Sequence, residues 1–167
     1  MDIEYVEATA SDAKCLLEFL KQVATETHNL TFEADELVLN ELQEIENIKA
    51  SHDSKNSLMI LAKDNGRIVG NVTLSGSNRK RIQHRSSLGI SVLKEYWHQG
   101  IGSNLLAAAI GYAIENDIAI IELEVLATNK NAIALYEKFG FETIGVYKEY
   151  FIVNGETIDA KLMNLYL

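Results

Sequence analysis

Two acidic side chains on one expected strand are the first feature of the sequence that could do chemistry. The segment IAIIELEVLA, residues 118–127, has the pattern of a strand, in which successive side chains point to opposite faces. Glu122 and Glu124 therefore share a face with Ile120 and Leu126. Burial and mutual repulsion would make one of these carboxylates a better proton acceptor, as a general base requires. The alternative is a solvent-facing strand edge that carries two ordinary acids.

A Gly-x-Gly turn is the second such feature. In HQGIGSNLL, Gly100 and Gly102 lie between a strand and a long apolar segment. Glycine lets the backbone approach an anion, and the free N–H groups that begin a helix can bind phosphate or pyrophosphate. A dinucleotide fingerprint does not fit, because its third glycine position is Leu105, and a Walker A loop does not fit, because lysine follows neither glycine. The amides of residues 98–103 could converge on a phosphate, or the glycines could only form a tight connection.

The hydrophobic pattern predicts the elements that position these residues. Two hairpins are expected around Asn65-Gly66 and Asn154-Gly155, where Asn-Gly favours a tight turn. The expected strands cover residues 2–9, 57–76 as a hairpin, 84–93, 118–127 and the last 25 residues as a second hairpin, and the expected helices cover about 11–28, 32–51, 100–116 and 129–139. The second helix should bury Leu37, Leu39, Leu42, Ile45 and Ile48, and the third, nearly all apolar, should be buried.

The resulting order is β-α-α-β-β-β-α-β-α-β-β, which predicts an α/β (α+β) fold with a mixed sheet flanked by helices. Neither an internal repeat nor a linker-like stretch interrupts the chain of 167 residues. With 47% hydrophobic residues the chain can build a core. One domain over residues 1–167 is therefore expected.

Composition narrows the environment and the partners. A net charge of −9 argues against nucleic-acid binding, and the one basic cluster is expected to be a solvated hairpin tip rather than an RNA contact. That cluster consists of Arg79, Lys80, Arg81 and Arg85. The absence of a long apolar run predicts no membrane span, and the acidic beginning, Met1-Asp2-Ile3-Glu4, predicts no signal peptide.

Cysteine and histidine usage add two expectations. Cys15 is the only cysteine, which excludes an internal disulfide and fits a reducing cytoplasm, and its surroundings predict a buried, inert thiol. The four histidines have no cysteine or carboxylate at ligand spacing, so no metal is expected.

Two segments, ISVLKEYWHQGIGSNLL and LEVLATNKNAIALYEKFGFETIG, together resemble the Gcn5-related N-acetyltransferase (GNAT) superfamily. The first is similar to its acyl-CoA signature, Gln/Arg-x-x-Gly-x-Gly/Ala, except that Trp97 stands where Gln or Arg is usual. The second is similar to its Asn-x-x-Ala-x-x-Leu-Tyr-Glu-Lys-x-Gly-Phe segment, over Asn129 to Phe141. The resemblance implies a mixed, mostly antiparallel sheet of about seven strands with four helices, splayed between its fourth and fifth strands to admit acetyl-CoA.

The resemblance also assigns residues to the cofactor. Ile90, Ser91 and Val92 would pair their backbone with the pantetheine amides, like an added strand. The pyrophosphate would bind at His98, Gln99, Gly100, Ile101, Gly102 and Ser103. Asn129 would reach the cofactor from the start of the next helix, which it could also cap. The missing Gln or Arg side chain at Trp97 would remove one phosphate contact.

Acetyl transfer to an amine requires a base for the amine, stabilisation of an oxyanion and a proton for the leaving thiolate. Tyr136 occupies the general-acid position of the family, although it also borders a core face. Glu124 precedes Asn129 by five positions, as the base glutamate does in ribosomal-protein alanine acetyltransferases of this superfamily. Glu26 lies in the connection that borders the acceptor site in this family, with His28 and His84 as further titratable candidates.

The sequence thus predicts an acetyl-CoA-dependent N-acetyltransferase that acetylates a primary amine of a small molecule or protein N-terminus by direct transfer. The alternatives are a catalytically silent acyl-CoA-binding regulatory module and a partner-binding subunit that keeps the fold for its surface. The acceptor could be a polyamine, an amino acid, an aminoglycoside or a protein N-terminus. Strands rich in Tyr, Phe, Leu and Ile in the last 25 residues predict a homodimer through the C-terminal hairpin.

Overall fold

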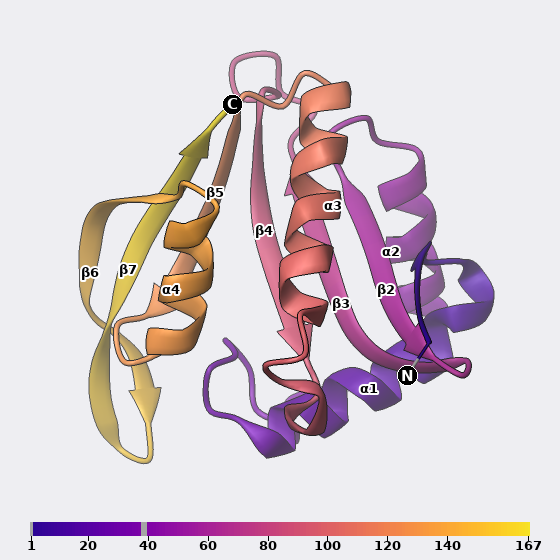
Figure 1. The fold of residues 1–167 in the computed structure, drawn as a ribbon, viewed down its shortest axis with the longest axis horizontal. Helices are drawn as coiled ribbons and strands as arrows, with labels where there is room; N and C mark the ends of the chain where they lie inside the picture. Colours follow the sequence, from indigo (N-terminus) through magenta and orange to yellow (C-terminus); the bar gives the residue numbers. More distant parts are fainter. Residues whose placement is uncertain (1, 38–39) are drawn as a thin grey trace.

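The computed structural model describes residues 2–37 and 40–167. Its strands form one seven-stranded sheet in the order β1-β2-β3-β4-β5-β7-β6 (Figure 1). The elements along the chain are β1 (Ile3–Glu7), a short helix at Ala10–Asp12, α1 (Ala13–Glu26), α2 (Glu41–His52), β2 (Leu58–Asp64), β3 (Arg67–Gly76), β4 (Arg85–Val92), a short helix at Lys94–Tyr96, α3 (Ile101–Glu115), β5 (Ile120–Leu126), α4 (Lys130–Lys138), β6 (Glu142–Val153) and β7 (Glu156–Tyr166). The predicted order of elements and the mixed sheet with four helices are confirmed.

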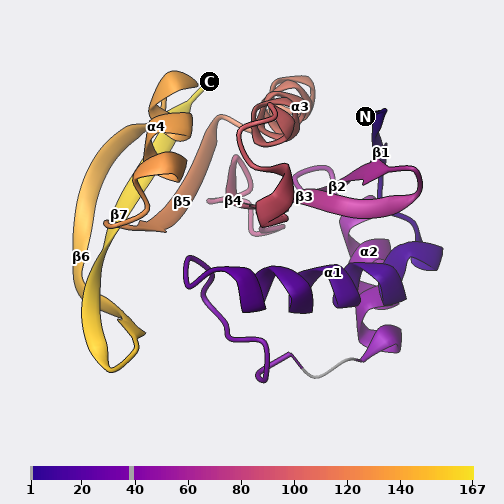
Figure 2. The same ribbon diagram turned by 60° about the horizontal axis from the view of Figure 1, so that its bottom comes forward.

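The helices cover both faces of the sheet. Figure 2 shows α1 and α2 beneath one face and α3 and α4 above the other. All neighbouring strands pair antiparallel except β4 and β5, which pair in parallel. This parallel pairing covers only three residue pairs, from Arg85 with Ile120 to Ser87 with Glu122. Beyond them the two strands separate, so the sheet opens where the sequence predicts the cofactor.

Both Asn-Gly pairs form the predicted hairpin turns. Asn65 and Gly66 have φ values of 49° and 82°, and Asn154 and Gly155 have values of 52° and 80°. Positive φ at both central residues matches the right-handed twist of the strands that the turn joins. The turns join β2 to β3 and β6 to β7, and they fix the registers on either side of the gap.

Helix α2 is shorter than predicted and packs through fewer residues. It begins after Asn40, whose side chain accepts a hydrogen bond from the Gln43 N–H at 3.1 Å and so caps the helix. Ile48 is buried as predicted, but Leu42 is 74% exposed, so the prediction that Leu42 packs against the core is wrong. Leu37 lies before the helix, and Leu39 lies outside the described residues.

Two further burial predictions are wrong. Helix α3 buries one side through Ile101, Leu105, Leu106, Ala109 and Ala113, whereas Ile114 is 62% exposed. The neighbours of Cys15, Leu16 and Leu17, face the core, and Cys15 itself is exposed because it lies on the opposite side of α1. Both predictions relied on the apolar composition of the segment. In a helix, the 3.6-residue period decides which side chains face the core.

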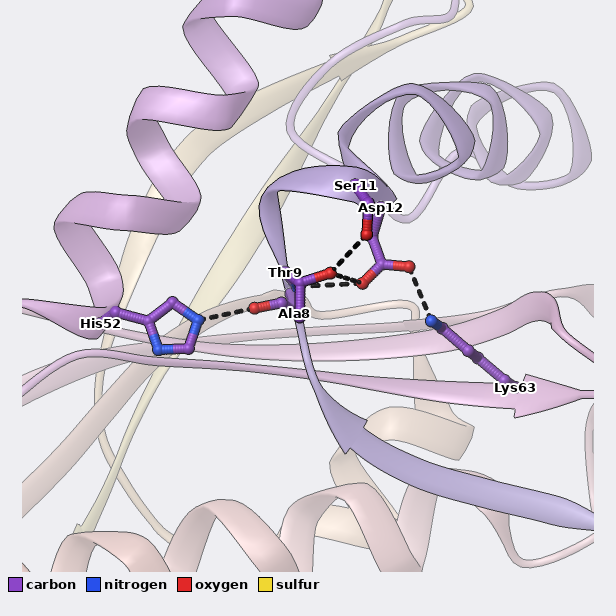
Figure 3. A network of polar contacts seen from close by, with 6 residues as sticks. All are labelled: Ala8, Thr9, Ser11, Asp12, His52 and Lys63. Atoms are coloured by element: carbon purple, nitrogen blue, oxygen red, sulfur yellow. Dashed lines mark hydrogen bonds and ion pairs between the residues drawn. The ribbon is translucent and has the colours of Figure 1, made fainter.

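A polar network joins the start of α1 to the sheet (Figure 3). The Asp12 carboxylate accepts hydrogen bonds from the Thr9 N–H at 2.9 Å and the Thr9 hydroxyl at 2.8 Å, and Lys63 of β2 pairs with it at 2.6 Å. Burial alone would raise the pKa of Asp12, but these hydrogen bonds outweigh it and lower the pKa. Nearby, a ring nitrogen of His52 lies 2.7 Å from the Ala8 carbonyl oxygen, which ties the end of α2 to the same connection. The network thereby orients α1, which forms one wall of the site.

Candidate active site

A cleft of about 650 Å³ passes through the opening between β4 and β5. On one side of the sheet it is bounded by the beginning of α3 and by α4, and on the other by α1 and the segment that follows it. Its lining includes most of the predicted site residues, namely Ile90, Ser91, Val92, His98, Gly100, Ile101, Gly102, Ser103, Glu124, Asn129 and Tyr136. The fold therefore brings both expected halves of the site, cofactor and chemistry, to one cavity.

The register of β4 decides which of its backbone groups face the opening. The Leu93 N–H donates to the Val69 carbonyl at 2.9 Å, so the odd-numbered residues of β4 bond to β3 in the alternating antiparallel ladder. Ile90 and Val92 consequently turn their backbone groups away from β3, towards the opening. Ser91 turns its backbone to β3, and its hydroxyl donates to the Asn71 side chain at 2.6 Å. The predicted backbone pairing with pantetheine is therefore open to both backbone groups of Ile90 and to the N–H of Val92, whose carbonyl accepts from the Trp97 indole N–H. At Ser91 the backbone groups bond to β3 instead.

The glycine turn begins α3 with three free donors. Gly100 has φ +85° and precedes the helix, and the Asn104 N–H already donates to its carbonyl at 3.0 Å. The N–H groups of Ile101, Gly102 and Ser103 have no backbone acceptor within the described chain, as expected at a helix start. This cradle fits an anion, because the donors point outward at the positive end of the helix dipole.

The residues before the glycines, His98 and Gln99, shape the approach to this turn. His98 has φ +60°, which bends the chain sharply before the glycines. Gln99, which does not line the cleft, donates from its side chain to the Glu95 carbonyl at 2.8 Å. A Cβ atom at Gly102 would come no closer than 3.5 Å to the Leu135 side chain, so the position itself has room for a larger residue.

Trp97 stands where the family pattern has Gln or Arg, and its side chain makes a contact within the protein. Its indole N–H donates to the Val92 carbonyl at 2.8 Å, on the side of β4 that faces the opening. The ring lines the cleft. Trp97 thus fixes the chain between β4 and the glycine turn by an internal hydrogen bond where the family pattern offers a polar side chain.

Tyr136 lies on α4 with its ring buried. Its ring packs against Phe141 with the centroids 5.5 Å apart, and the residue is 7% exposed. Burial raises the pKa of the Tyr136 hydroxyl above its ordinary value, so the group stays protonated at neutral pH. Among the described residues, every enclosed polar side-chain atom has a hydrogen-bond partner. The Tyr136 hydroxyl has no such partner within these residues, so it is not enclosed and reaches the cleft that Tyr136 lines. The packing role and a proton-donor role can both hold.

Glu124 faces the α1 side of the sheet and is exposed, as in the second of the two alternatives for this strand. It lines the main cleft and also a second cavity of about 230 Å³ on the uncovered face of β5, β7 and β6. Glu122 shares that face as predicted, but it accepts hydrogen bonds from the Arg85 guanidinium, at 2.9 Å from Nε. Arg85 therefore belongs to an ion pair rather than to the exposed basic loop. Glu124, by contrast, has no hydrogen-bond or ion-pair partner among the described side chains, and its carboxylate lies at the opening.

Glu26 does not line the cleft. One of its carboxylate oxygens accepts from the Gln22 side chain at 2.9 Å, and the other accepts from the Lys94 N–H at 2.7 Å. This geometry favours a structural role, joining the end of α1 to the segment before α3, over the predicted contact with the acceptor. His28 and His84 are exposed and do not line the cleft either.

Asn129 caps α4, with its side-chain oxygen accepting from the Ala132 N–H at 3.3 Å, and it lines the cleft as well. Sequence reasoning missed the residues that line the cleft on the α1 side, including Leu20, Leu30, Phe32, Met59 and Asn71. Asn71 alone carried a signal, as a polar residue within a buried strand.

No group of three metal-ligating side chains is present in residues 2–37 and 40–167. Within the same residues, no helix combines the length and apolar character needed to cross a membrane.

Comparison with known proteins connects this site to a family. The sequence model of the acetyltransferase (GNAT) family matches residues 17–141. A GNAT-family acetyltransferase from Streptococcus pneumoniae has a similar crystal structure, with a TM-score of 0.96 and 32% identity over 99% of this chain and 100% of that one. A phosphinothricin acetyltransferase from Sinorhizobium meliloti in complex with AcCoA shares the fold, with a TM-score of 0.87 and 21% identity, over 100% of this chain and 89% of that one.

Curated relatives match over shorter stretches. The L-amino acid N-acetyltransferase AaaT of Escherichia coli is 35% identical over 106 residues, which are 62% of this chain and 65% of that protein. The matches to the first three curated relatives span between 48% and 65% of those proteins. The family match, the full-length likeness to a solved member and the splayed sheet agree, and the chain belongs to the GNAT acetyltransferase family.

Proposed function

We propose that the protein is an acetyl-CoA-dependent N-acetyltransferase that moves the acetyl group directly to a primary amine. The observation that supports this most is the convergence of three features on one cleft: the free N–H groups of the glycine turn, the hydroxyl of Tyr136 and the carboxylate of Glu124. A module that only bound acyl-CoA would need the first feature and neither of the others.

In this proposal each group has one task. The free N–H groups of Ile101, Gly102 and Ser103 hold the pyrophosphate, with His98, Gln99 and Gly100 shaping the loop and Asn129 contributing from α4. The backbone groups of Ile90 and the N–H of Val92 pair with the pantetheine arm. Ser91 acts by supporting β4 through Asn71.

Two side chains would move protons. Glu124 accepts a proton from the amine, directly or through water, on the α1 side of the opening. The Tyr136 hydroxyl donates to the thiolate that leaves on the α4 side, and its burial keeps it protonated for that step. Glu124 of β5 and Tyr136 of α4 reach the opening from opposite faces of the sheet. Deprotonation of the amine and protonation of the thiolate can therefore use different residues.

Two assays test the proposal. Acetyl-CoA should raise the melting temperature, because a ligand that binds only the folded state stabilises it. Incubation with acetyl-CoA and a panel of amines should release free thiol only when an acceptor is present. A thermal shift without amine-dependent thiol release would favour the silent acyl-CoA-binding module, and no thermal shift would contradict the cofactor assignment.

We further propose that the protein works in the cytoplasm as a single domain, needs neither metal nor nucleic acid, and forms a homodimer. The hairpin of β6 and β7 supports a dimer, because β6 is an edge strand with exposed apolar residues such as Tyr150 and Ile152, at 49% and 72% exposure. Light scattering should give twice the monomer mass of 18.6 kDa at micromolar concentration. A monomer mass throughout that range would contradict the dimer.

A further inference from the structure

The acceptor side of the cleft has two compartments that meet at Glu124. The main cleft extends from the opening beneath α1, and the smaller cavity lies on the face of β5, β7 and β6 that α1 does not cover. Glu124 lines both, so an amine that approaches its carboxylate has room on either side. The chemistry of the two compartments then indicates what is attached to that amine.

The compartment beneath α1 has an apolar part and a polar part. The apolar part comes from α1, the segment after it and β2, and is formed by Leu16, Leu20, Val23, Leu30, Phe32 and Met59. The polar part is formed by Thr27, Asn29, Thr31, Glu44, Asn71 and Thr73. An apolar group that enters the apolar part is removed from water, which favours a hydrocarbon substituent next to the amine.

The charges of the cleft disfavour a free carboxylate beside that amine. Glu44 and Glu124 are the acidic residues of the lining, and no Lys or Arg belongs to it within the described residues. Arg85 lines the second cavity, but its guanidinium is bound to Glu122. A free amino acid would bring its carboxylate close to Glu124 without a cation to pair with it, which Coulomb repulsion penalises.

The second compartment suits amide groups instead. Ser87, Asn164, Tyr147 and the Arg85–Glu122 pair line it and offer both donors and acceptors. It opens on an uncovered sheet face, where a longer chain can continue into solvent. Tyr147 lies at its edge, 47% exposed.

Building on the proposed function, we propose that the acceptor is a peptide or protein N-terminus whose first residue has an apolar side chain. The amine lies at Glu124, the first side chain enters the apolar part of the compartment beneath α1, and the following peptide groups cross the second compartment. The products are the Nα-acetylated peptide and CoA with its thiol protonated, so no other reactant is needed.

A set of matched acceptors tests the substrate class. These are leucine, leucinamide, glycinamide, the peptide Leu-Gly-Gly-Gly-amide and spermidine, with kcat/KM expressed per unprotonated amine because the amines differ in basicity. Leucinamide should exceed leucine by about tenfold, from the uncompensated carboxylate, and should exceed glycinamide by at least about tenfold, from burial of the side chain. The peptide should exceed leucinamide by about fivefold.

Two variant pairs test the two compartments. Phe32→Ala should reduce the leucinamide-to-glycinamide ratio several-fold, whereas Leu42→Ala, at an exposed position outside the cleft, should leave that ratio as it is. Tyr147→Ala should reduce the peptide-to-leucinamide ratio about fivefold. Val146→Ala is its control, since Val146 is 46% exposed on the same strand and lies outside the cavity.

The outcomes separate this inference from the function on which it rests. If leucine or spermidine is the best acceptor, or if the variants change neither ratio, the inference is overturned while amine acetylation stands. If no amine releases thiol although acetyl-CoA raises the melting temperature, the proposed function fails and the inference fails with it.

Discussion

The two halves of the cleft are built in different ways. The proposed cofactor half offers backbone groups at the end of β4 and the beginning of α3, from residues close together in the chain. The proposed acceptor half offers side chains from α1, the segment after it, and β2 to β5, which only the tertiary fold brings together. A backbone cradle depends on glycine and local conformation, whereas a side-chain wall can change residue by residue. The first half should therefore tolerate few substitutions, and the second should be tuned by many.

The cofactor half should be broken most completely by Gly102→Glu. The Cβ position has room, so the fold should persist, but the new carboxylate would occupy the anion cradle and repel a pyrophosphate. Acetyl-CoA binding measured by calorimetry should be abolished, with circular dichroism unchanged.

Gly111→Glu is the matched control for that variant. It makes the same substitution on the same helix, at a position whose Cβ would have no neighbour within 4 Å. It should bind acetyl-CoA like the wild type. Equal affinity of the Gly102 variant and the wild type would show that the cradle does not bind the cofactor.

The next largest effect should come from Tyr136→Phe. The variant keeps the ring that packs on Phe141 and removes only the hydroxyl, so cofactor affinity should persist while kcat falls by about 10²–10⁴-fold, as is typical for loss of one general acid. Raising the pH should not restore the rate, because it supplies no proton to the thiolate. Wild-type turnover in this variant would leave Tyr136 with its packing role alone.

The sequence predicted the cofactor half better than the acceptor half. Gly100 has a positive φ that sets the start of α3, and Asn65 and Asn154 have positive φ values that set their turns, so local patterns were enough to place them. The ladder alternation that turns Ser91 towards β3 depends on its partner strand, which no local pattern specifies.

The acceptor half could not be predicted because its contacts are between distant residues. Glu26 is engaged by Lys94, 68 positions away, and Glu122 is engaged by Arg85, 37 positions away. Strand alternation placed Glu122 and Glu124 on one face, but it could not show that this face lacks a covering helix beside β5. Of the two alternatives for this strand, burial or exposure of both acids, neither holds in full, because Glu122 is ion-paired with Arg85 and Glu124 is exposed.

Glu124→Gln should affect the acceptor half and leave the cofactor half intact. Without the carboxylate, deprotonation of the amine depends on solvent, so the loss of kcat/KM should be largest at low pH. It should shrink as the pH approaches the usual pKa of a peptide α-amino group, about 8. Acetyl-CoA affinity should not change. A deficit that is the same at every pH would mean that Glu124 is not the base.

The smallest effect should come from Trp97→Phe, which tests a side-chain hydrogen bond in the proposed cofactor half. The variant keeps an aromatic ring on the cleft wall but removes the indole N–H that donates to the Val92 carbonyl. One such hydrogen bond contributes about 1 kcal/mol net, so if it preorganises the loop before the glycine turn, acetyl-CoA should bind about fivefold more weakly.

Trp97→Arg is the companion variant. It also removes this hydrogen bond, but it places a cation where the family pattern has Gln or Arg. Binding tighter than wild type in the arginine variant would show that a phosphate contact outweighs the lost internal bond. Unchanged binding in Trp97→Phe would mean that the indole N–H does not set the loop, and that the glycines alone maintain the cradle.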